Sequence, residues 1–210
     1  LAVRAAQEGA DAAIVDLDIV NPYFRTADFR QLFEEKGIKL IAPDFANSKE
    51  NIARDLALAK DAGFTDIVVD VRPTTGDVLF KTNLVDQVKF MYAWIGSNYT
   101  KVERTATWDY LQAFVDEARK QGLRIHAAIN TFVGGNQIDG GTGLLYRDQS
   151  KAEWATQMNM QVGITSVMNT SESTKFFNPA HPEVQTFLCD LLKDLAGYDL
   201  DGIFLDRGRF

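Results

Sequence analysis

Polar side chains that could act as acids, bases or hydrogen-bonding groups fall at the ends of short apolar runs. Asp206 follows the run 203–205, Asn130 closes another run, and Asp70 and Arg72 close a third. Hydrolysis of a glycoside needs two carboxyl groups, one as nucleophile or base and the other as acid. An amide such as that of Asn130 can both donate to and accept from sugar hydroxyls. We therefore take Asp206 as a candidate catalytic carboxylate and the other three as candidate substrate-binding residues.

Two of these assignments have structural alternatives. The alternation of a strand puts Asp70 and Arg72 on one face. Charge near the carboxyl end of a barrel strand needs a polar destination, which an active site there would supply. A buried ion pair between Asp70 and Arg72 is the alternative. For Asp206, the alternative is a structural carboxylate bound to Arg207 or Arg209.

Three more residues complete the set of candidate substrate contacts. Arg207 directly follows the candidate carboxylate, and Asn178 closes a short run ahead of a proline-led helix. Trp94 lies in a long aromatic segment, and its ring offers a face on which a pyranose can pack. His126 lies nearer the start of its strand, so we expect a hydrogen-bonded core histidine there.

The elements that must position these residues alternate between β-branched runs and amphipathic stretches, which is typical of α/β proteins with parallel strands. The expected strands are 13–19, 39–42, 66–72, 124–130, 175–177 and 202–206. The expected helices are 1–8, 26–36, 49–61, 107–121, 151–160 and 182–196. Segments 73–106 and 131–150 are too long for simple connections, and loops of this length are usually functional or disordered. Aromatic residues in the first of them predict an ordered excursion.

Composition excludes several classes of function. The 210 residues are 46% hydrophobic and 24% charged, and 22 basic residues face 29 acidic ones, for a formal net charge of −7. Without a basic excess we expect no nucleic-acid partner. No apolar run approaches the length of a membrane-spanning helix. The single cysteine, Cys189, excludes a disulfide framework and a multi-cysteine metal site. We expect no cofactor and no metal.

The first 47 residues resemble a partition-type P-loop ATPase. The resemblance rests on the string VDLDIVNPYFRTADF, in which Asp16 and Asp18 close a strand. In that family such an aspartate lies beside the magnesium and phosphates of the nucleotide. A phosphate cradle also needs the motif G-x-x-x-x-G-K-[ST], which is absent. We interpret residues 1–48 as a short α/β fragment of a P-loop-type fold that lacks Walker A, with ATPase activity as an alternative function.

Residues 49–210 resemble the glycosyl-hydrolase-like ten family, TIM-barrel proteins related to the α-amylase clan and found in Bacteroidota. The resemblance rests on three ordered blocks: KENIARDLALAKDAGFTDIVVDVRPTTGDVLF, GLRIHAAINTF and FFNPAHPEVQTFLCDLLKDLAGYDLDGIFLDRGRF. It implies an incomplete (β/α)8 barrel holding the first four strands. Because the two families are not expected to be fused, we predict a chimera joined near residues 45–48.

The resemblance also implies a mechanism. In the α-amylase clan the nucleophilic aspartate ends the fourth strand, the place that Asp206 matches. An arginine usually stands two residues earlier, where this chain has Phe204. The acid is expected from a later strand. The full-length parent is therefore expected to hydrolyse O-glycosidic bonds in polysaccharide or oligosaccharide, and the chain itself to be inactive.

Three expectations concern alternatives and surroundings. The alternative within the same fold is a carbohydrate-binding barrel that does not cleave. An open barrel edge predicts self-association. The family is often exported to the periplasm or cell surface, whereas the sugar, the linkage and the stereochemistry are outside what the residues determine.

Overall fold

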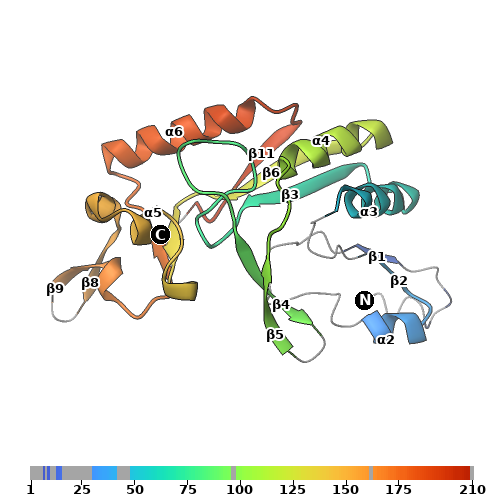
Figure 1. Cartoon of the computed structure of the whole chain (residues 1–210), viewed down its shortest axis with the longest axis horizontal. Coiled ribbons are helices and arrows are strands. Elements are labelled where there is room, and N and C mark those ends of the chain that lie inside the picture. Colours follow the sequence, from blue (N-terminus) through green and yellow to red (C-terminus); the bar gives the residue numbers. More distant parts are fainter. Residues whose placement is uncertain are drawn as a thin grey trace. The chain divides into compact units, whose positions relative to one another are not determined.

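A computed structural model describes residues 7, 9, 13–15, 30–41, 48–95, 98–160 and 163–208 of the chain. The chain divides into two compact units (Figure 1). The first unit comprises Leu1–Asp70 and Lys89–His126, and the second comprises Val71–Val88 and Ala127–Phe210. Each unit is described by itself.

The first unit holds two small sheets and the helices that flank them. Its elements are β1 (Ala13–Val15), α2 (Arg30–Glu35), β2 (Lys39–Ile41), α3 (Lys49–Asp61), the first part of β3 (Asp66–Arg72), β4 (Phe90–Ile95), β5 (Asn98–Glu103), α4 (Tyr110–Gln121) and the first part of β6 (Arg124–Asn130). β1 and β2 pair in parallel, and β4 and β5 form an antiparallel hairpin. The hairpin confirms that the first long segment makes an ordered excursion.

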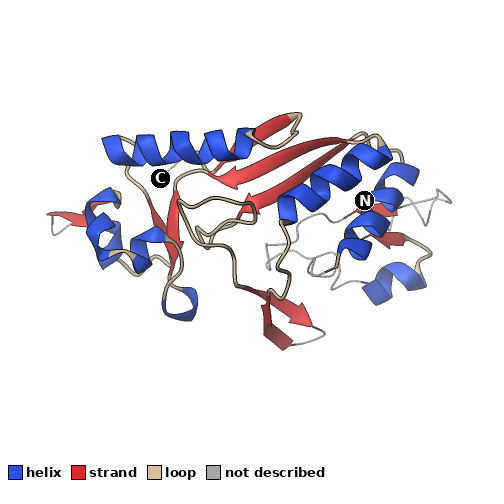
Figure 2. Cartoon of the chain, turned by 45° about the horizontal axis from the view of Figure 1, so that its top comes forward, coloured by secondary structure: helices blue, strands red, loops and turns tan. Residues whose placement is uncertain are grey.

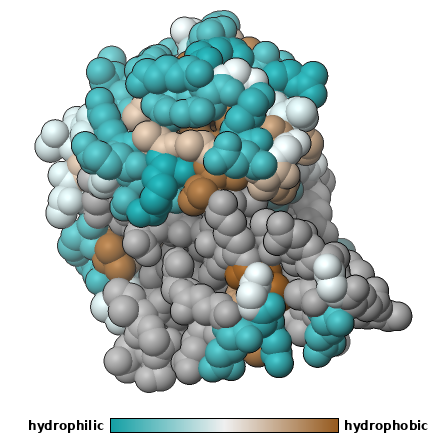
Figure 3. Space-filling model, turned by 90° about the vertical axis from the view of Figure 1, so that its right-hand side faces the viewer, coloured by the Kyte–Doolittle hydropathy of each residue, from teal (hydrophilic) through white to brown (hydrophobic). Residues whose placement is uncertain are grey.

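Local sequence explains the two long helices of this unit. Ser48 caps α3 by accepting a hydrogen bond from the Asn51 amide, and Asp109 caps α4 in the same way. Gly122 ends α4 in the left-handed conformation, with φ 64°, which glycine adopts without steric cost. The buried faces of α3 and α4 pack against each other through residues such as Leu56 and Leu111, which are both 0% exposed. On the side drawn in Figure 3, the coloured residues are predominantly hydrophilic.

The second unit carries the carboxyl ends of β3 and β6 and the remainder of the chain. Its further elements are β7 (Val133–Asn136), η2 (Ile138–Gly140), α5 (Leu144–Arg147), η3 (Gln149–Trp154), β8 (Gln157–Met160), β9 (Gly163–Ser166), η4 (Val167–Asn169), β10 (Thr174–Phe176), α6 (Pro182–Ala196) and β11 (Gly202–Asp206). A short turn joins α6 to β11 (Figure 2). Pro182 begins α6, where its missing N–H costs nothing.

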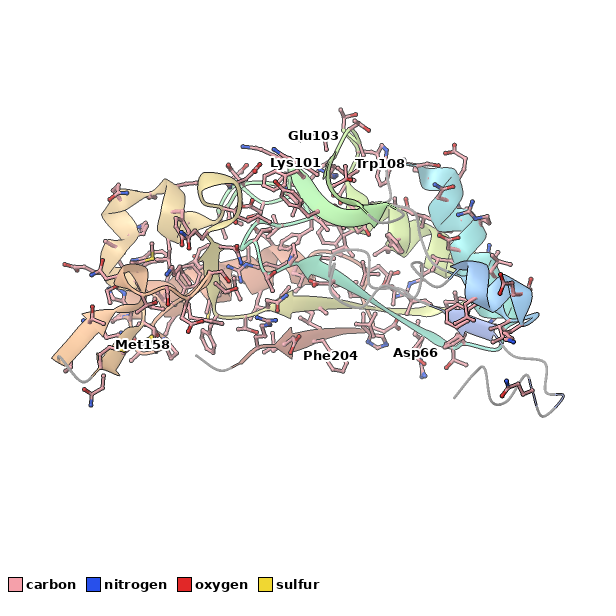
Figure 4. The ribbon with its side chains drawn as sticks, turned by 90° about the horizontal axis from the view of Figure 1, so that it is seen from below. Asp66, Lys101, Glu103, Trp108, Met158 and Phe204 are labelled. Carbon is pink, nitrogen blue, oxygen red and sulfur yellow. The ribbon has the colours of Figure 1, made fainter. Side chains whose placement is uncertain are left out.

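The central sheet has the order β11-β6-β3. At the starts of two strands, the Arg124 amide donates to the Thr65 carbonyl, and at their ends the Asn130 side chain donates to the Arg72 carbonyl. β3 and β6 therefore run parallel, as expected for an α/β fold. Within β3 the side chains alternate, so that Val69 is 2% exposed while Val68 is 39% exposed. In β11 both faces are open, and Phe204 projects away from the ribbon (Figure 4).

Two expectations about elements in the second unit are wrong. The predicted helix 151–160 is a 3-10 helix followed by strand β8, because residues 157–160 pair antiparallel with β9 in a hairpin. The strand near residue 175, counted as one of four parallel strands, pairs antiparallel with β7 instead. Among the described residues, the parallel sheet therefore has three strands, and Asp206 ends the third along the chain.

Several predictions fall outside the described residues. Most of the predicted helix 1–8, the end of the strand 13–19 with Asp16 and Asp18, and the residues around the predicted join at 45–48 are among them. The P-loop fragment and the domain boundary at residue 48 therefore stay predictions.

Candidate functional site

Asp206 lies at the carboxyl end of β11 and is exposed. Its carbonyl accepts a hydrogen bond of 2.8 Å from the Thr131 amide, which holds the strand end against the end of β6. The carboxylate Oδ1 accepts the Arg207 amide at 2.7 Å. Arg207 itself has φ 44°, a left-handed conformation that costs a non-glycine residue about 1 kcal/mol or more. The strand thus ends in a sharp turn that presents a solvent-accessible carboxylate.

Arg72 and Asn130 tie the ends of β3 and β6 together. Arg72 is 0% exposed, and its guanidinium donates to the carbonyls of Asn130, Thr131 and Val133. Asn130 is 5% exposed and returns a hydrogen bond of 2.9 Å from Nδ2 to the Arg72 carbonyl. We expected both side chains to meet substrate, but in the structure both are buried and bonded to backbone. Buried backbone carbonyls need hydrogen-bond partners, and these two side chains supply them. The geometry therefore favours a structural role, in which Arg72 and Asn130 hold the ends of β3 and β6 together.

Asp70 belongs to the first unit, where it is half-buried. Its negative charge acts on Tyr110, a residue that is 1% exposed and whose hydroxyl has no hydrogen-bond partner among the described residues. Burial, with the Asp70 charge second, raises the pKa of Tyr110 well above its usual range. Arg104, also in this unit, acts in the opposite direction on Tyr110. Asp70 therefore interacts electrostatically with a buried tyrosine, which the sequence did not indicate.

The remaining candidates fall at different places. Asn178 is half-buried, and its side chain accepts the Ala180 amide at 3.0 Å, which shapes the turn before α6. Trp94 lies in β4, and its side chain is outside the described part of the structure. Trp108, expected in a helix, lies two residues before α4 and stacks on Tyr110 with ring centroids 6.3 Å apart.

His126 is part of a cluster at the starts of β3 and β6. Its Nε2 lies 2.9 Å from Asp66 Oδ1, and Arg124 donates to the two oxygens of the same carboxylate at 2.7 and 2.6 Å. The hydrogen bond from Arg124, followed by those from Thr65 and His126, holds the pKa of Asp66 well below its usual range. The expected hydrogen bond of His126 is confirmed, although the side chain is 22% exposed and not fully in the core.

A cluster that the sequence analysis missed occupies the second unit. Arg147 donates to both carboxylate oxygens of Asp77, at 2.6 and 2.9 Å, and to Asp86 at 3.1 Å. The Asp77 side chain is 3% exposed, and burial raises its pKa despite the opposing effect of Arg147. The available signal was indirect: the residues come from the two long segments 73–106 and 131–150, whose length is typical of functional or disordered loops.

In residues 48–95, 98–160 and 163–208 and the shorter described stretches, no cluster of His, Cys, Asp and Glu has the makings of a metal site. Within the same residues, no helix combines the length and apolarity needed to cross a bilayer.

Comparison with known proteins gives one sequence relative and two solved structures of note. An S-layer-related protein from Niallia circulans is 29% identical over 167 residues, which are 77% of this chain and 10% of that protein. The chain thus spans about a tenth of the length of this curated relative. A hypothetical protein from Ruminiclostridium thermocellum has a TM-score of 0.50 and 15% identity, covering 78% of this chain and 73% of the other.

The second solved structure is alpha-L-fucosidase isoenzyme 2 from Paenibacillus thiaminolyticus. Its TM-score is 0.50 at 18% identity, covering 76% of this chain and 20% of the fucosidase. At this identity the likeness concerns the fold alone, and it places a glycosidase among the structural neighbours of this mixed α/β chain.

The family model described as Glycosyl hydrolase-like 10 matches residues 34–208. The match begins before residue 49, where we expected the resemblance to start, and it includes residues of both units and every strand of the central sheet. The chain carries a glycoside hydrolase-like domain and belongs to the Glycosyl hydrolase-like 10 family.

Proposed function

We propose that the protein hydrolyses O-glycosidic bonds in oligosaccharide or polysaccharide, with Asp206 as one of the two catalytic carboxyl groups. The observation that carries this proposal is the position of Asp206: an exposed carboxylate at the carboxyl end of a parallel strand, in a chain of a glycosyl hydrolase-like family. In barrel enzymes, catalytic groups lie at the carboxyl ends of the strands.

The surroundings of Asp206 suit a carboxylate that must be held in one place. The Thr131–Asp206 backbone hydrogen bond and the Arg207 amide fix the strand end and the carboxylate. The left-handed Arg207 is a local conformational cost of a kind that clusters at functional sites. In this arrangement Arg72 and Asn130 position the neighbouring strand end without contacting sugar.

The second carboxyl group, the acid, would come from another strand end of a (β/α)8 barrel of which β3, β6 and β11 are neighbouring strands. A pair about 5–5.5 Å apart would retain the configuration of the sugar, and a wider pair would invert it. Asp70, Asn178, Arg207 and Trp94 remain the proposed substrate contacts. The name of the Niallia circulans relative, an S-layer-related protein, supports an exported location for the protein proposed here.

The test uses the complete gene product, incubated with 4-nitrophenyl α- and β-glycosides of the common hexoses and of fucose. We expect turnover of at least one glycoside and a fall of about 10³-fold or more in kcat/KM for Asp206→Asn. Asp190→Asn is the matched control, because Asp190 is an exposed aspartate of α6 that pairs with Lys193. Turnover that survives Asp206→Asn would disprove the proposed role.

A second candidate function is carbohydrate binding without cleavage. The specific observation that favours it is Phe204, which is 60% exposed at the place where the α-amylase clan usually has an arginine. Saturable binding of oligosaccharides by a gene product that releases no sugar from any of the glycosides would support this candidate over the hydrolase.

A further inference from the structure

The second unit contains a pocket that none of the strand-end residues lines. Its volume is about 450 Å³, within the range of about 300–1,000 Å³ that is usual for small-molecule sites. The walls come from the loop after β3 and from the start of α5; they are formed by Thr82, Asn83, Leu84, Val85, Asp86, Gln87, Gly143, Leu144 and Arg147. Both wall segments belong to the second unit, so the pocket is complete within it.

Arg147 is held in place from behind and still offers donors. Its Nη1 and Nη2 grip the buried Asp77 carboxylate, and Nη1 also reaches Asp86. A guanidinium has five N–H groups, and these contacts engage three of them. The Nε–H and one Nη2–H have no protein partner among the described residues. The side chain is 30% exposed, so a ligand in the pocket can reach it.

The wall that contains Gly143 is closely packed against neighbouring backbone, which only glycine allows. Gly143 has φ 74°, and a Cβ there would lie 2.5 Å from the Gly134 carbonyl oxygen and 2.9 Å from that of Thr75. Three backbone segments therefore approach each other more closely than any other residue would allow. The Gly143 amide also donates to Asp77. A wall that needs no rearrangement reduces the entropy lost on binding.

The charges and surfaces of the pocket define the class of ligand. The carboxylates of Asp77 and Asp86 and the guanidinium of Arg147 together carry at most one net negative charge, which disfavours binding of an anion. Asp86, whose side chain is 49% exposed, can accept from hydroxyls, while Asn83 and Arg147 can donate to them. Leu84, Val85 and Leu144 supply an apolar flank of the kind that covers the C–H face of a sugar ring.

We propose that this pocket binds one neutral hexose unit of a saccharide, with Asp86, Asn83 and Arg147 as its hydrogen-bonding groups, at a site separate from Asp206. The structure shows the pocket and its hydrogen-bond donors and acceptors. The choice of a saccharide over another neutral polyol rests on the proposed function. Asp77 is a positioning residue here, because it fixes Arg147 and is itself buried.

The experiment maps binding by amide chemical shifts in the ¹⁵N-labelled 210-residue chain. The probes are methyl α-D-glucopyranoside and methyl α-D-galactopyranoside, with D-glucuronate as the anionic counterpart. We expect shifts at residues 82–87 and 143–147 with a millimolar Kd for at least one neutral probe, as is usual for so small a ligand. We expect weaker binding of glucuronate.

Variants separate this pocket from the strand-end site. Asp86→Ala should weaken binding by about ten-fold or more, and Leu84→Arg, which fills the pocket, should abolish it. Asp190→Ala is the matched control, and Asp206→Asn should leave binding here unchanged. Binding that is lost in Asp206→Asn but retained in Leu84→Arg would overturn this inference while supporting the proposed hydrolase. Saturable binding with shifts at residues 82–87, together with no turnover of any glycoside, would support this inference and overturn the proposed hydrolase. No saturable shift with either neutral probe would also overturn it.

Discussion

Breaking the Arg147–Asp77 ion pair should lower the free energy of unfolding by an amount that depends on pH. Replacing Arg147 by Met removes both donors from a carboxylate whose side chain is 3% exposed. The stranded carboxylate must then either stay charged in a poor environment or take up a proton. Because the Arg147 side chain is 30% exposed and solvent can partly replace it, we expect a loss of about 2–3 kcal/mol in the free energy of unfolding at pH 7.

The same variant should recover stability in acid. Burial already raises the pKa of Asp77 in the folded chain, and removal of Arg147 raises it further. A group whose folded pKa lies above its unfolded value binds more protons when folded, so stability falls as pH rises through that interval. Relative to the parent chain, the deficit should shrink by up to about 1.4 kcal/mol for each pH unit below the new pKa.

Urea unfolding followed by circular dichroism, at several pH values between 5 and 8, measures both effects. The double variant Arg147→Met/Asp77→Asn should be less destabilised than Arg147→Met alone, because no buried charge remains. Lys193→Met, which breaks an exposed pair on α6, serves as the control and should change little. A deficit for Arg147→Met that is below about 1 kcal/mol, or that is equal at pH 5 and pH 8, would refute the reasoning.

Three further predictions concern the rest of the chain. Asp66→Asn should remove part of the acid sensitivity. The pKa of Asp66 is lowered on folding, so its contribution to stability is present above the unfolded pKa near 4 and is lost as pH falls. The free energies of unfolding of the two chains should therefore differ above that pH and converge below it. Gly143→Ala should cost more than Gly140→Ala in urea unfolding, because both have positive φ but only the first Cβ meets backbone atoms; equal costs would contradict the close approach. The isolated chain should self-associate through β11, where Phe204 and Leu205 are 60% and 53% exposed, and Phe204→Lys should lower the sedimentation-average mass; a monomer at all concentrations would count against an open strand edge.

Local patterns in the sequence predicted the elements with the strongest periodicity. The strands 66–72, 124–130 and 202–206 and the helices 49–61 and 182–196 have the bounds that the structure gives them. Their signals are short-range: β-branched runs, the Ser48 cap, Gly122 in the left-handed region and Pro182 in the first turn. The family, too, was available from three ordered blocks, and the match over residues 34–208 confirms it.

Two failures concern strands whose partners the sequence analysis did not identify. Residues 151–160 contain good helix formers, yet their second half, β8, pairs antiparallel with β9. The run at 174–176 looks like a barrel strand by composition, but its partner is β7 and its direction is antiparallel. The partner of β10 lies in a distant segment of the chain, so the run itself carries no signal of it.

The amino-acid sequence by itself determined the three strands of the central sheet, which carboxylate ends the last of them, and to which family the chain belongs. These features depend on neighbours a few positions away in the sequence, so local sequence patterns are enough to predict them. The roles of the polar side chains were decided by tertiary contacts: Arg72 turns inward to three carbonyls, while Arg147, Asp77 and Asp86 meet across 61 and 70 positions to form one side of a pocket. A charged residue goes wherever the fold provides partners for it, and that place is known only when the backbone is folded.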